Sequence, residues 1–197
     1  MPERRPFVIF SLAGVRVTYN APVVLTFTFV CAAVMLASGF TGGRLAGEYF
    51  SVARGMDFGL VSSWFRLVTH VIGHQSWEHL LANFAFFLLL GPILEEKYGS
   101  RVLAAMMLIT ALVSGGLNIL LFSTGLMGAS GVVFMFIILA SFANYRAGQV
   151  PLTFVLVVLL FLLREVFASV GDDNISQFAH ILGGVIGSFF GFWLDHK

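Results

Sequence analysis

The chain of 197 residues contains few charged residues for its length. Only 11% are Asp, Glu, Lys or Arg, whereas a soluble domain usually carries about 25%. Hydrophobic residues make up 58% of the chain. So few charges cannot cover the surface of a water-soluble globule, and we expect the surplus apolar surface to face lipid. The composition therefore predicts a membrane protein and excludes an ordinary soluble domain.

Cysteine is also nearly absent, since Cys31 is the single one. One thiol excludes an intrachain disulfide, and in an apolar run it is expected to be a small buried hydrophobe. The net charge of +1 gives no basic stripe, so we expect no nucleic-acid partner. The first apolar run, residues 21–40, is too long for the core of a cleavable signal peptide, although Arg4 and Arg5 faintly resemble a twin-arginine signal.

Apolar runs predict an all-α membrane protein with six transmembrane helices. The absence of repeats and low-complexity segments indicates a single domain, residues 1–197, with an N-terminal segment over about 1–20 and a long loop over about 41–78. The second, fourth and sixth spans carry polar or glycine positions, so we expect them to form a shielded interior. The predicted spans cover residues 21–40, 79–94, 102–122, 130–145, 150–166 and 178–194.

Basic residues in the loops predict the orientation in the membrane. With a cytoplasmic N-terminus, seven basic residues lie inside (Arg4, Arg5, Arg16, Lys97, Arg101, Arg146 and Lys197) and four outside (Arg44, Arg54, Arg66 and Arg164). We therefore expect both termini in the cytoplasm and the loop 41–78 outside. This loop is apolar and aromatic with few charges, so we expect it to lie in the headgroup region and to pack on the bundle.

Four polar side chains occur within or beside the predicted spans, where such groups are costly and indicate function. His79 and Asn83 lie at i and i+4 on the second span and share one face. Ser130 opens the fourth span within Gly-Ala-Ser-Gly at 128–131, and His180 lies near the start of the sixth. Counting spans along the chain places all four near the outer end of the bundle.

These residue types are suited to acyl transfer. A serine hydroxyl needs a base to take its proton, and the imidazole of His180 can do so near neutral pH. Ser130 begins a helix, where unpaired backbone N–H groups and the positive end of the helix dipole favour an oxyanion. The Asn83 amide and the His79 ring could add side-chain donors, each typically worth about 3–4 kcal/mol.

Glycines on the sixth span predict how the two reactive groups meet. Gly183, Gly187 and Gly191 recur every four residues and follow His180 at i+3, i+7 and i+11. Such a small-residue face permits close packing against a neighbouring helix. If the neighbour is the fourth span, His180 comes within hydrogen-bond reach of Ser130.

Four motifs together resemble the rhomboid intramembrane serine proteases, in their minimal six-helix bacterial form. They are His-x-x-x-Asn at 79–83, Glu-x-x-x-Gly-Ser at 95–100, Gly-Ala-Ser-Gly at 128–131 and Ala-His-x-x-Gly at 179–183. Each is weak alone, but their order and spacing make the combination specific. Two positions depart from the family pattern: Trp64 is separated from Arg66 by one residue, and Phe134 stands where many relatives have tyrosine.

The resemblance implies a Ser130–His180 dyad without an acidic third member, and an oxyanion site that includes His79 and Asn83. We also expect no cofactor and no metal. The resemblance further implies a location in the bacterial inner membrane, a wet cavity open to the outer face, and substrates that are single-span membrane proteins. The fifth helix or the loop capping the cavity would be the gate, and the oligomeric state stays open.

Two other functions compete with proteolysis. A catalytically silent relative would bind membrane helices, but such relatives generally lack the serine or the histidine, and this chain has both. A small transporter or metal-handling protein could use His70, His74 and His79, yet no inverted repeat is visible. We expect His70 and His74 to hydrogen-bond the long loop, and Glu95 to anchor the inner end of the second span.

Overall fold

The computed structural model of the chain describes residues 7–12, 15–141, 152–153, 155–156, 159–160 and 174–194, and for residues 7, 10, 12, 174–180, 192 and 194 it describes the backbone alone. The elements are β1 (Phe7–Leu12), β2 (Val15–Tyr19), α1 (Pro22–Phe40), α2 (Arg44–Tyr49), α3 (Val61–Thr69), α4 (Trp77–Tyr98), α5 (Ser100–Leu121), α6 (Ser130–Ser141) and α8 (Asn174–Leu194).

The helical elements match the predicted spans closely. The first three spans are α1, α4 and α5, with 19, 22 and 22 residues, each long and apolar enough to cross a membrane. The fourth begins at Ser130 as expected, and the sixth begins at Asn174, four residues before its predicted start. Most of the fifth predicted span lies outside the described residues, so the count of six helices stays a prediction.

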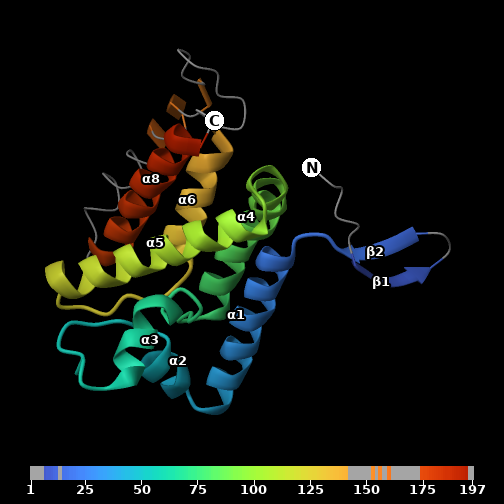
Figure 1. The fold of residues 1–197 in the computed structure, drawn as a ribbon. Coiled ribbons are helices and arrows are strands. Elements are labelled where there is room, and N and C mark those ends of the chain that lie inside the picture. The colour runs from blue at the N-terminus through green and yellow to red at the C-terminus, as the bar shows by residue number, and fades with distance from the viewer. Residues whose placement is uncertain are drawn as a thin grey trace.

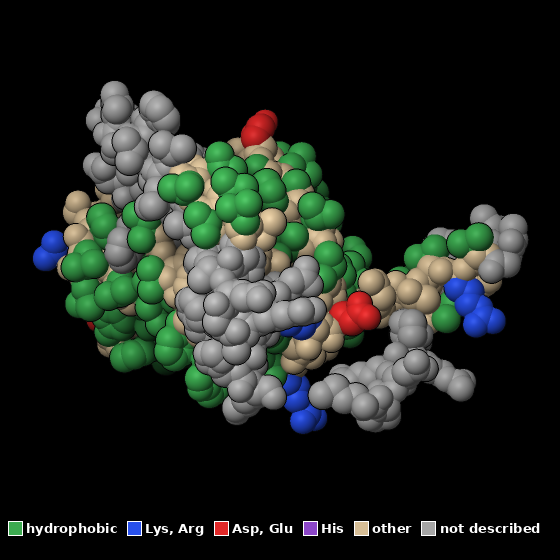
Figure 2. Space-filling view, turned by 90° about the horizontal axis from the view of Figure 1, so that it is seen from above, with side chains coloured by type: hydrophobic (Ala, Val, Ile, Leu, Met, Phe, Trp, Pro, Cys, Tyr) green, Lys and Arg blue, Asp and Glu red, His purple; other side chains and the backbone are tan. Residues whose placement is uncertain are grey.

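The helices form a bundle with α2 and α3 gathered at one end (Figure 1). The helices α4, α6 and α8 begin toward this α2–α3 end and run away from it, α1 runs in the opposite sense, and α5 lies obliquely across them (Figure 1). Helix α6 packs against α8 and α4, α1 packs against α4, and α3 packs against α5. Hydrophobic side chains cover much of the helical body seen from above (Figure 2).

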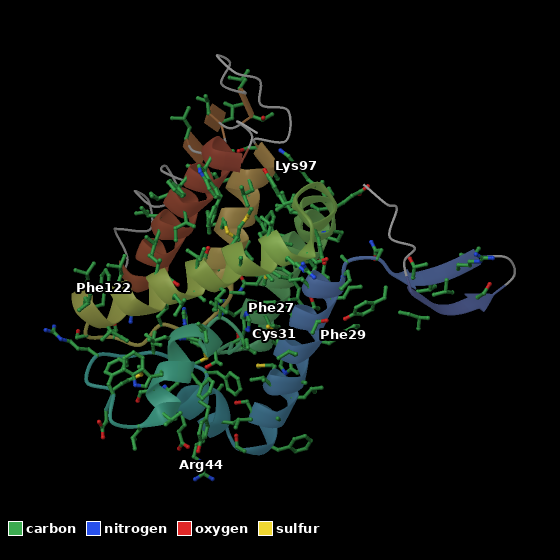
Figure 3. All side chains as sticks on the ribbon, viewed as in Figure 1. Phe27, Phe29, Cys31, Arg44, Lys97 and Phe122 are labelled. Atoms are coloured by element: carbon green, nitrogen blue, oxygen red, sulfur yellow. The ribbon has the colours of Figure 1, made fainter. Side chains whose placement is uncertain are left out.

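Helix α6 is the centre of the core. Its residues from Val132 to Phe136 are all buried, as expected for a helix that is hydrophobic on every side. The Phe136 ring stacks on Phe87 of α4 with centroids 4.9 Å apart, and Phe87 also contacts Phe27 of α1. Phe27 and Phe29 lie on opposite sides of α1, one toward the helices and one away from them (Figure 3).

The predicted interior group needs one correction. Among α1, α4 and α5, helix α5 is the most buried, at 44% of its apolar window against 28% for α4. Small residues on α5 explain this, because they allow the α2–α3 end to approach closely. A Cβ on Gly115 would lie 2.8 Å from the Leu67 carbonyl oxygen. The third span, rather than the second, is therefore the better shielded.

Glu95 joins α4 to the start of α1. Its two carboxylate oxygens accept the backbone N–H groups of Val23 and Val24, each at 3.0 Å. These amides belong to the first turn of α1, where no intrahelical carbonyl is available and negative charge is favoured. The expected structural role of Glu95 is thus confirmed, and α1 is the element that it holds.

An N-terminal β-hairpin was not predicted. Strands β1 and β2 pair antiparallel, from Phe7 opposite Tyr19 to Leu12 opposite Val15, with an irregularity between Val8 and Phe10. The hairpin extends away from the helical body in two perpendicular views (Figures 1 and 2). The available signal was a run of β-branched and aromatic residues on each side of an Ala-Gly pair.

Candidate active site

Ser130 is the first residue of α6 and is half-buried. The loop leading to it contains Gly128, whose φ of 126° favours glycine. A Cβ at Gly128 would also lie 2.6 Å from Cε1 and 2.8 Å from Nε2 of the His79 ring. Backbone conformation and space therefore both require glycine here, and the His79 ring lies directly against the loop that presents Ser130.

The loop before Ser130 is held by backbone contacts with the α2–α3 end. The Gly128 N–H donates to the His70 carbonyl at 2.9 Å. Leu126 and Val52 exchange two backbone hydrogen bonds, at 2.7 and 3.0 Å. Asn118 of α5 donates its amide to the Thr124 carbonyl at 3.1 Å. The long loop expected outside the membrane therefore supports the loop before Ser130, residues 122–129, which we call the serine loop. These contacts give hydrogen-bond partners to the buried polar groups of the serine loop.

His70 links the α2–α3 end to α5. Its Nδ1 lies 3.1 Å from the Leu67 carbonyl and its Nε2 lies 3.3 Å from the Ser114 hydroxyl. Burial lowers the pKa of His70 to about 4, so the ring is neutral at pH 7. The expected hydrogen-bonding role of His70 is confirmed.

His74 contacts the serine loop directly, which sequence reasoning missed. Its Nδ1 lies 3.1 Å from the Ile72 carbonyl, and its Nε2 accepts the Ala129 backbone N–H at 3.5 Å. A carbonyl at one nitrogen and an amide donor at the other define the Nδ1–H tautomer. Burial, with a smaller contribution from the neighbouring His79, lowers the pKa of His74 to about 4. No local pattern in the sequence indicates the contact with Ala129.

His79 and Asn83 lie on the first two turns of α4. Ser76 caps this helix by accepting the His79 backbone N–H at 3.2 Å. The His79 and His74 rings meet edge to face, with centroids 5.1 Å apart. Asn83 is only 6% exposed, and its Nδ2 has no hydrogen-bond partner among the described residues. The α4 face thus brings a ring to the serine loop and a buried amide donor one turn deeper.

Glycines bring α8 into close contact with α6. A Cβ on Gly183 would overlap the carbonyl oxygen of Gly131. A Cβ on Gly187 would lie 2.9 Å from the Met135 carbonyl oxygen and 3.0 Å from Cβ of Ile138. The contacts advance in the same sense along both helices, so α6 and α8 are parallel (Figure 1). The predicted glycine contact with the fourth span is confirmed at Gly183 and Gly187, and at Gly191 it stays a prediction.

This contact places residue 180 of α8 at the end of the bundle where Ser130 lies. Gly131 directly follows Ser130, and residue 180 precedes Gly183 by one turn, about 4.5 Å along the axis, toward the start of the parallel helix α8. The backbone thus brings the two positions to one level. The predicted contact between the Ser130 hydroxyl and the His180 ring lies outside the described side chains.

The displaced tryptophan of the long loop keeps an anchoring contact. Trp64 donates its indole N–H to the Phe58 carbonyl at 3.0 Å, and its ring meets Phe58 edge to face. Arg66 donates from Nε to the Ser51 carbonyl at 2.6 Å. Phe134 is buried one turn below Ser130. The displacement of Trp64 therefore leaves the long loop anchored through Trp64 and Arg66.

Comparison with known proteins agrees with this geometry. The family model described as the Rhomboid domain matches residues 61–197. Rhomboid protease GlpG of Haemophilus influenzae is 23% identical over 180 residues, which cover 89% of this chain and 91% of that protein. Rhomboid protease GlpG of Yersinia pestis is 25% identical over 192 residues, which cover 95% of this chain and 68% of that protein. The chain belongs to the rhomboid family, and it is an integral membrane protein.

Proposed function

We propose that this chain is an intramembrane serine endopeptidase in which Ser130 is the nucleophile and His180 the base. The observation that carries the proposal is the contact of Gly183 with Gly131, because it sets residue 180 beside the level of Ser130. Membership of the rhomboid family supports the same assignment, since relatives that match nearly the whole chain are named as proteases.

The chemistry follows from the roles of the two groups. The Ser130 hydroxyl oxygen attacks the carbonyl carbon of the scissile bond while the His180 imidazole takes its proton. The imidazolium then gives that proton to the leaving amine, and a water molecule repeats the two steps on the acyl-enzyme. The pair acts without an acidic third member.

The oxyanion of the tetrahedral intermediate needs preorganised donors. The first-turn amides of α6 have no intrahelical carbonyl to bind, and we assign them to the oxyanion together with the Asn83 Nδ2 and the His79 ring. Burying an amide donor without a partner costs about 1–3 kcal/mol. Asn83 carries such a donor among the described residues, and a ligand that supplies the acceptor repays this cost.

The membrane arrangement that we propose has six spans, both termini in the cytoplasm and the site open to the outer face. The long apolar helices α1, α4 and α5 support it, as do the common level of Ser130 and residue 180 and the bias of basic residues. The matched relatives are bacterial, so we assign the chain to a bacterial inner membrane.

The proposed substrates are membrane-spanning proteins. A nucleophile at the start of a helix in an apolar bundle meets peptide bonds that arrive within or beside the bilayer. A helical substrate must unwind before a carbonyl can reach Ser130, because helical carbonyls are engaged in hydrogen bonds. We therefore expect cleavage near the outer ends of spans that carry helix-breaking residues.

Ser130→Ala tests the nucleophile. The purified protein in detergent should react covalently with a fluorophosphonate probe and cleave a reporter membrane helix, and Ser130→Ala should lose both activities while its melting temperature is retained. Ser141→Ala makes the same change at the other end of α6 and should keep both. Labelling that persists in Ser130→Ala would refute the assignment, and an unlabelled native protein that still binds the reporter would indicate a catalytically silent relative.

A further inference from the structure

The N-terminal hairpin has one apolar face and one mixed face. Paired residues of antiparallel strands lie on the same side of the sheet. The register therefore places Val15, Val17 and Tyr19 of β2 on one face, all apolar or aromatic. The other face holds Thr18 with Val8 and Arg16 with Ser11. We call the first of these the apolar face of the hairpin.

The apolar face is accessible rather than packed on the bundle. Val15 is 68% exposed and Val17 is 40% exposed. A two-stranded hairpin alone in water is marginally stable at best, and it needs a further surface to cover its apolar residues. The space-filling view shows it extending beyond the helical body, with hydrophobic and basic side chains along it (Figure 2).

Tyr19 connects the apolar face to the lipid-facing side of α1. Its hydroxyl lies 2.9 Å from the Thr26 hydroxyl, and its ring stacks on Phe29 with centroids 6.5 Å apart. Phe29 is 60% exposed and points away from the other helices (Figure 3). The apolar face of the hairpin is therefore continuous with a helix surface that lipid covers.

The connection to α1 keeps the hairpin at the membrane surface. Only Asn20 and Ala21 separate β2 from α1, and a link of this length reaches roughly 10 Å at most. Ala21 is fully buried, which holds the link against the bundle. The hairpin extends to the side of α1 rather than along its axis (Figure 1), so it lies level with the end of a membrane-spanning helix.

We propose that the β1–β2 hairpin is an interfacial anchor, which lies on the bilayer surface with its apolar face at the boundary between headgroups and acyl chains. Arg16 on the opposite face is within side-chain reach of lipid phosphates, so anionic lipid strengthens the contact. Lipid surrounds every copy of the chain at this level, whereas a second copy must be found by diffusion. The bilayer is therefore the occupant that the position favours.

Depth-dependent quenching tests the anchor. The variants Val17→Cys and Arg16→Cys of the full chain are labelled with an environment-sensitive fluorophore and reconstituted in phosphatidylcholine bilayers with and without phosphatidylglycerol. The unsubstituted protein, whose Cys31 is buried, gives the labelling background. Nitroxides near the headgroup end of the acyl chains should quench the label at 17 several-fold more than the label at 16, and aqueous iodide should show the reverse order.

Three outcomes would overturn the proposal. The first is equal access of iodide to both positions in bilayers. The second is protection at position 17 that disappears when the protein is diluted with excess lipid, which would indicate pairing with a second copy. The third concerns charge. We expect phosphatidylglycerol to increase nitroxide quenching of the label at position 17, and we expect the further substitution Arg16→Gln to remove that increase. No increase with Arg16 present would refute the role of anionic lipid.

Discussion

Buried polar groups at the α2–α3 end differ in how completely they are paired. Both ring nitrogens of His70 and of His74 face polar partners, and these partners belong to the long loop, α5 and the serine loop. Asn83 is equally buried, yet its Nδ2 has no partner among the described residues. Paired groups hold the structure, and an unpaired donor is available to a ligand.

Asn83→Ala should therefore affect turnover more than stability. Loss of one oxyanion donor lowers kcat by about 10²–10³, while KM for a reporter substrate changes little because the donor acts on the transition state. The melting temperature should be unchanged or higher, since the substitution removes a buried donor that lacks a partner. Steady-state kinetics in detergent and thermal unfolding measure the two effects. A raised KM with an unchanged kcat would contradict the oxyanion role.

At the scale of elements, the contact between α6 and α8 decides whether the proposed dyad can form. Its closest point is the backbone contact of Gly183 with Gly131, which leaves no space for a side chain. Adjacent residue Gly184 has ordinary spacing, since a Cβ there would lie 3.8 Å from the Ile138 side chain. Two neighbouring glycines on one helix thus differ in whether they tolerate a methyl group.

Gly183→Ala should separate α8 from α6 and misplace His180. We expect a destabilisation of about 1–3 kcal/mol from overpacking and a large loss of both probe labelling and cleavage. Gly184→Ala is the matched control and should keep activity, with a stability equal to or above the native one because alanine favours helix. Measurement of labelling rates and melting temperatures on both variants decides the point. Equal behaviour of the two would contradict the packing argument.

At the scale of the whole molecule, a few polar contacts join elements far apart in sequence. The Glu95 carboxylate, near the end of α4, accepts hydrogen bonds from the backbone at the start of α1. The His70 ring joins α3 to α5, and its carbonyl accepts from the serine loop. These contacts stand at opposite ends of a bundle that apolar packing otherwise holds together. Global stability therefore depends on the protonation state of the buried His70 ring, whose pKa burial lowers.

The stability of the fold should fall as the pH falls from about 6.5 toward about 4. An unfolded imidazole has its ordinary pKa of 6.5, whereas burial lowers that of His70 to about 4. Between these values the unfolded chain binds more protons than the folded one, so acid favours unfolding. Melting temperatures in detergent across this range measure the slope. His70→Gln keeps polar groups at this site without titrating there and should reduce the slope, and an unchanged slope would contradict the assignment.

Much of the candidate site could be predicted from the sequence alone. Composition and the length of apolar runs depend only on neighbouring residues, so they predicted a helical membrane protein and the positions of α1, α4 and α5 closely. The spacing of Gly183 and Gly187 predicted a close helix contact for a similar reason, because helix periodicity puts such residues on one face. Span counting then brought His79, Asn83 and Ser130 to one end.

The tertiary structure alone decided which distant groups meet. It paired the His74 ring with the Ala129 amide and the Glu95 carboxylate with the first backbone amides of α1. It also buried α5 more deeply than α4. It also folded the N-terminal residues into a hairpin whose Tyr19 hydroxyl meets the Thr26 hydroxyl of α1. Local patterns state which face of an element is apolar, but they do not state which segment covers it. That choice depends on packing between residues far apart in the chain, where shape and hydrogen-bond partners are settled together.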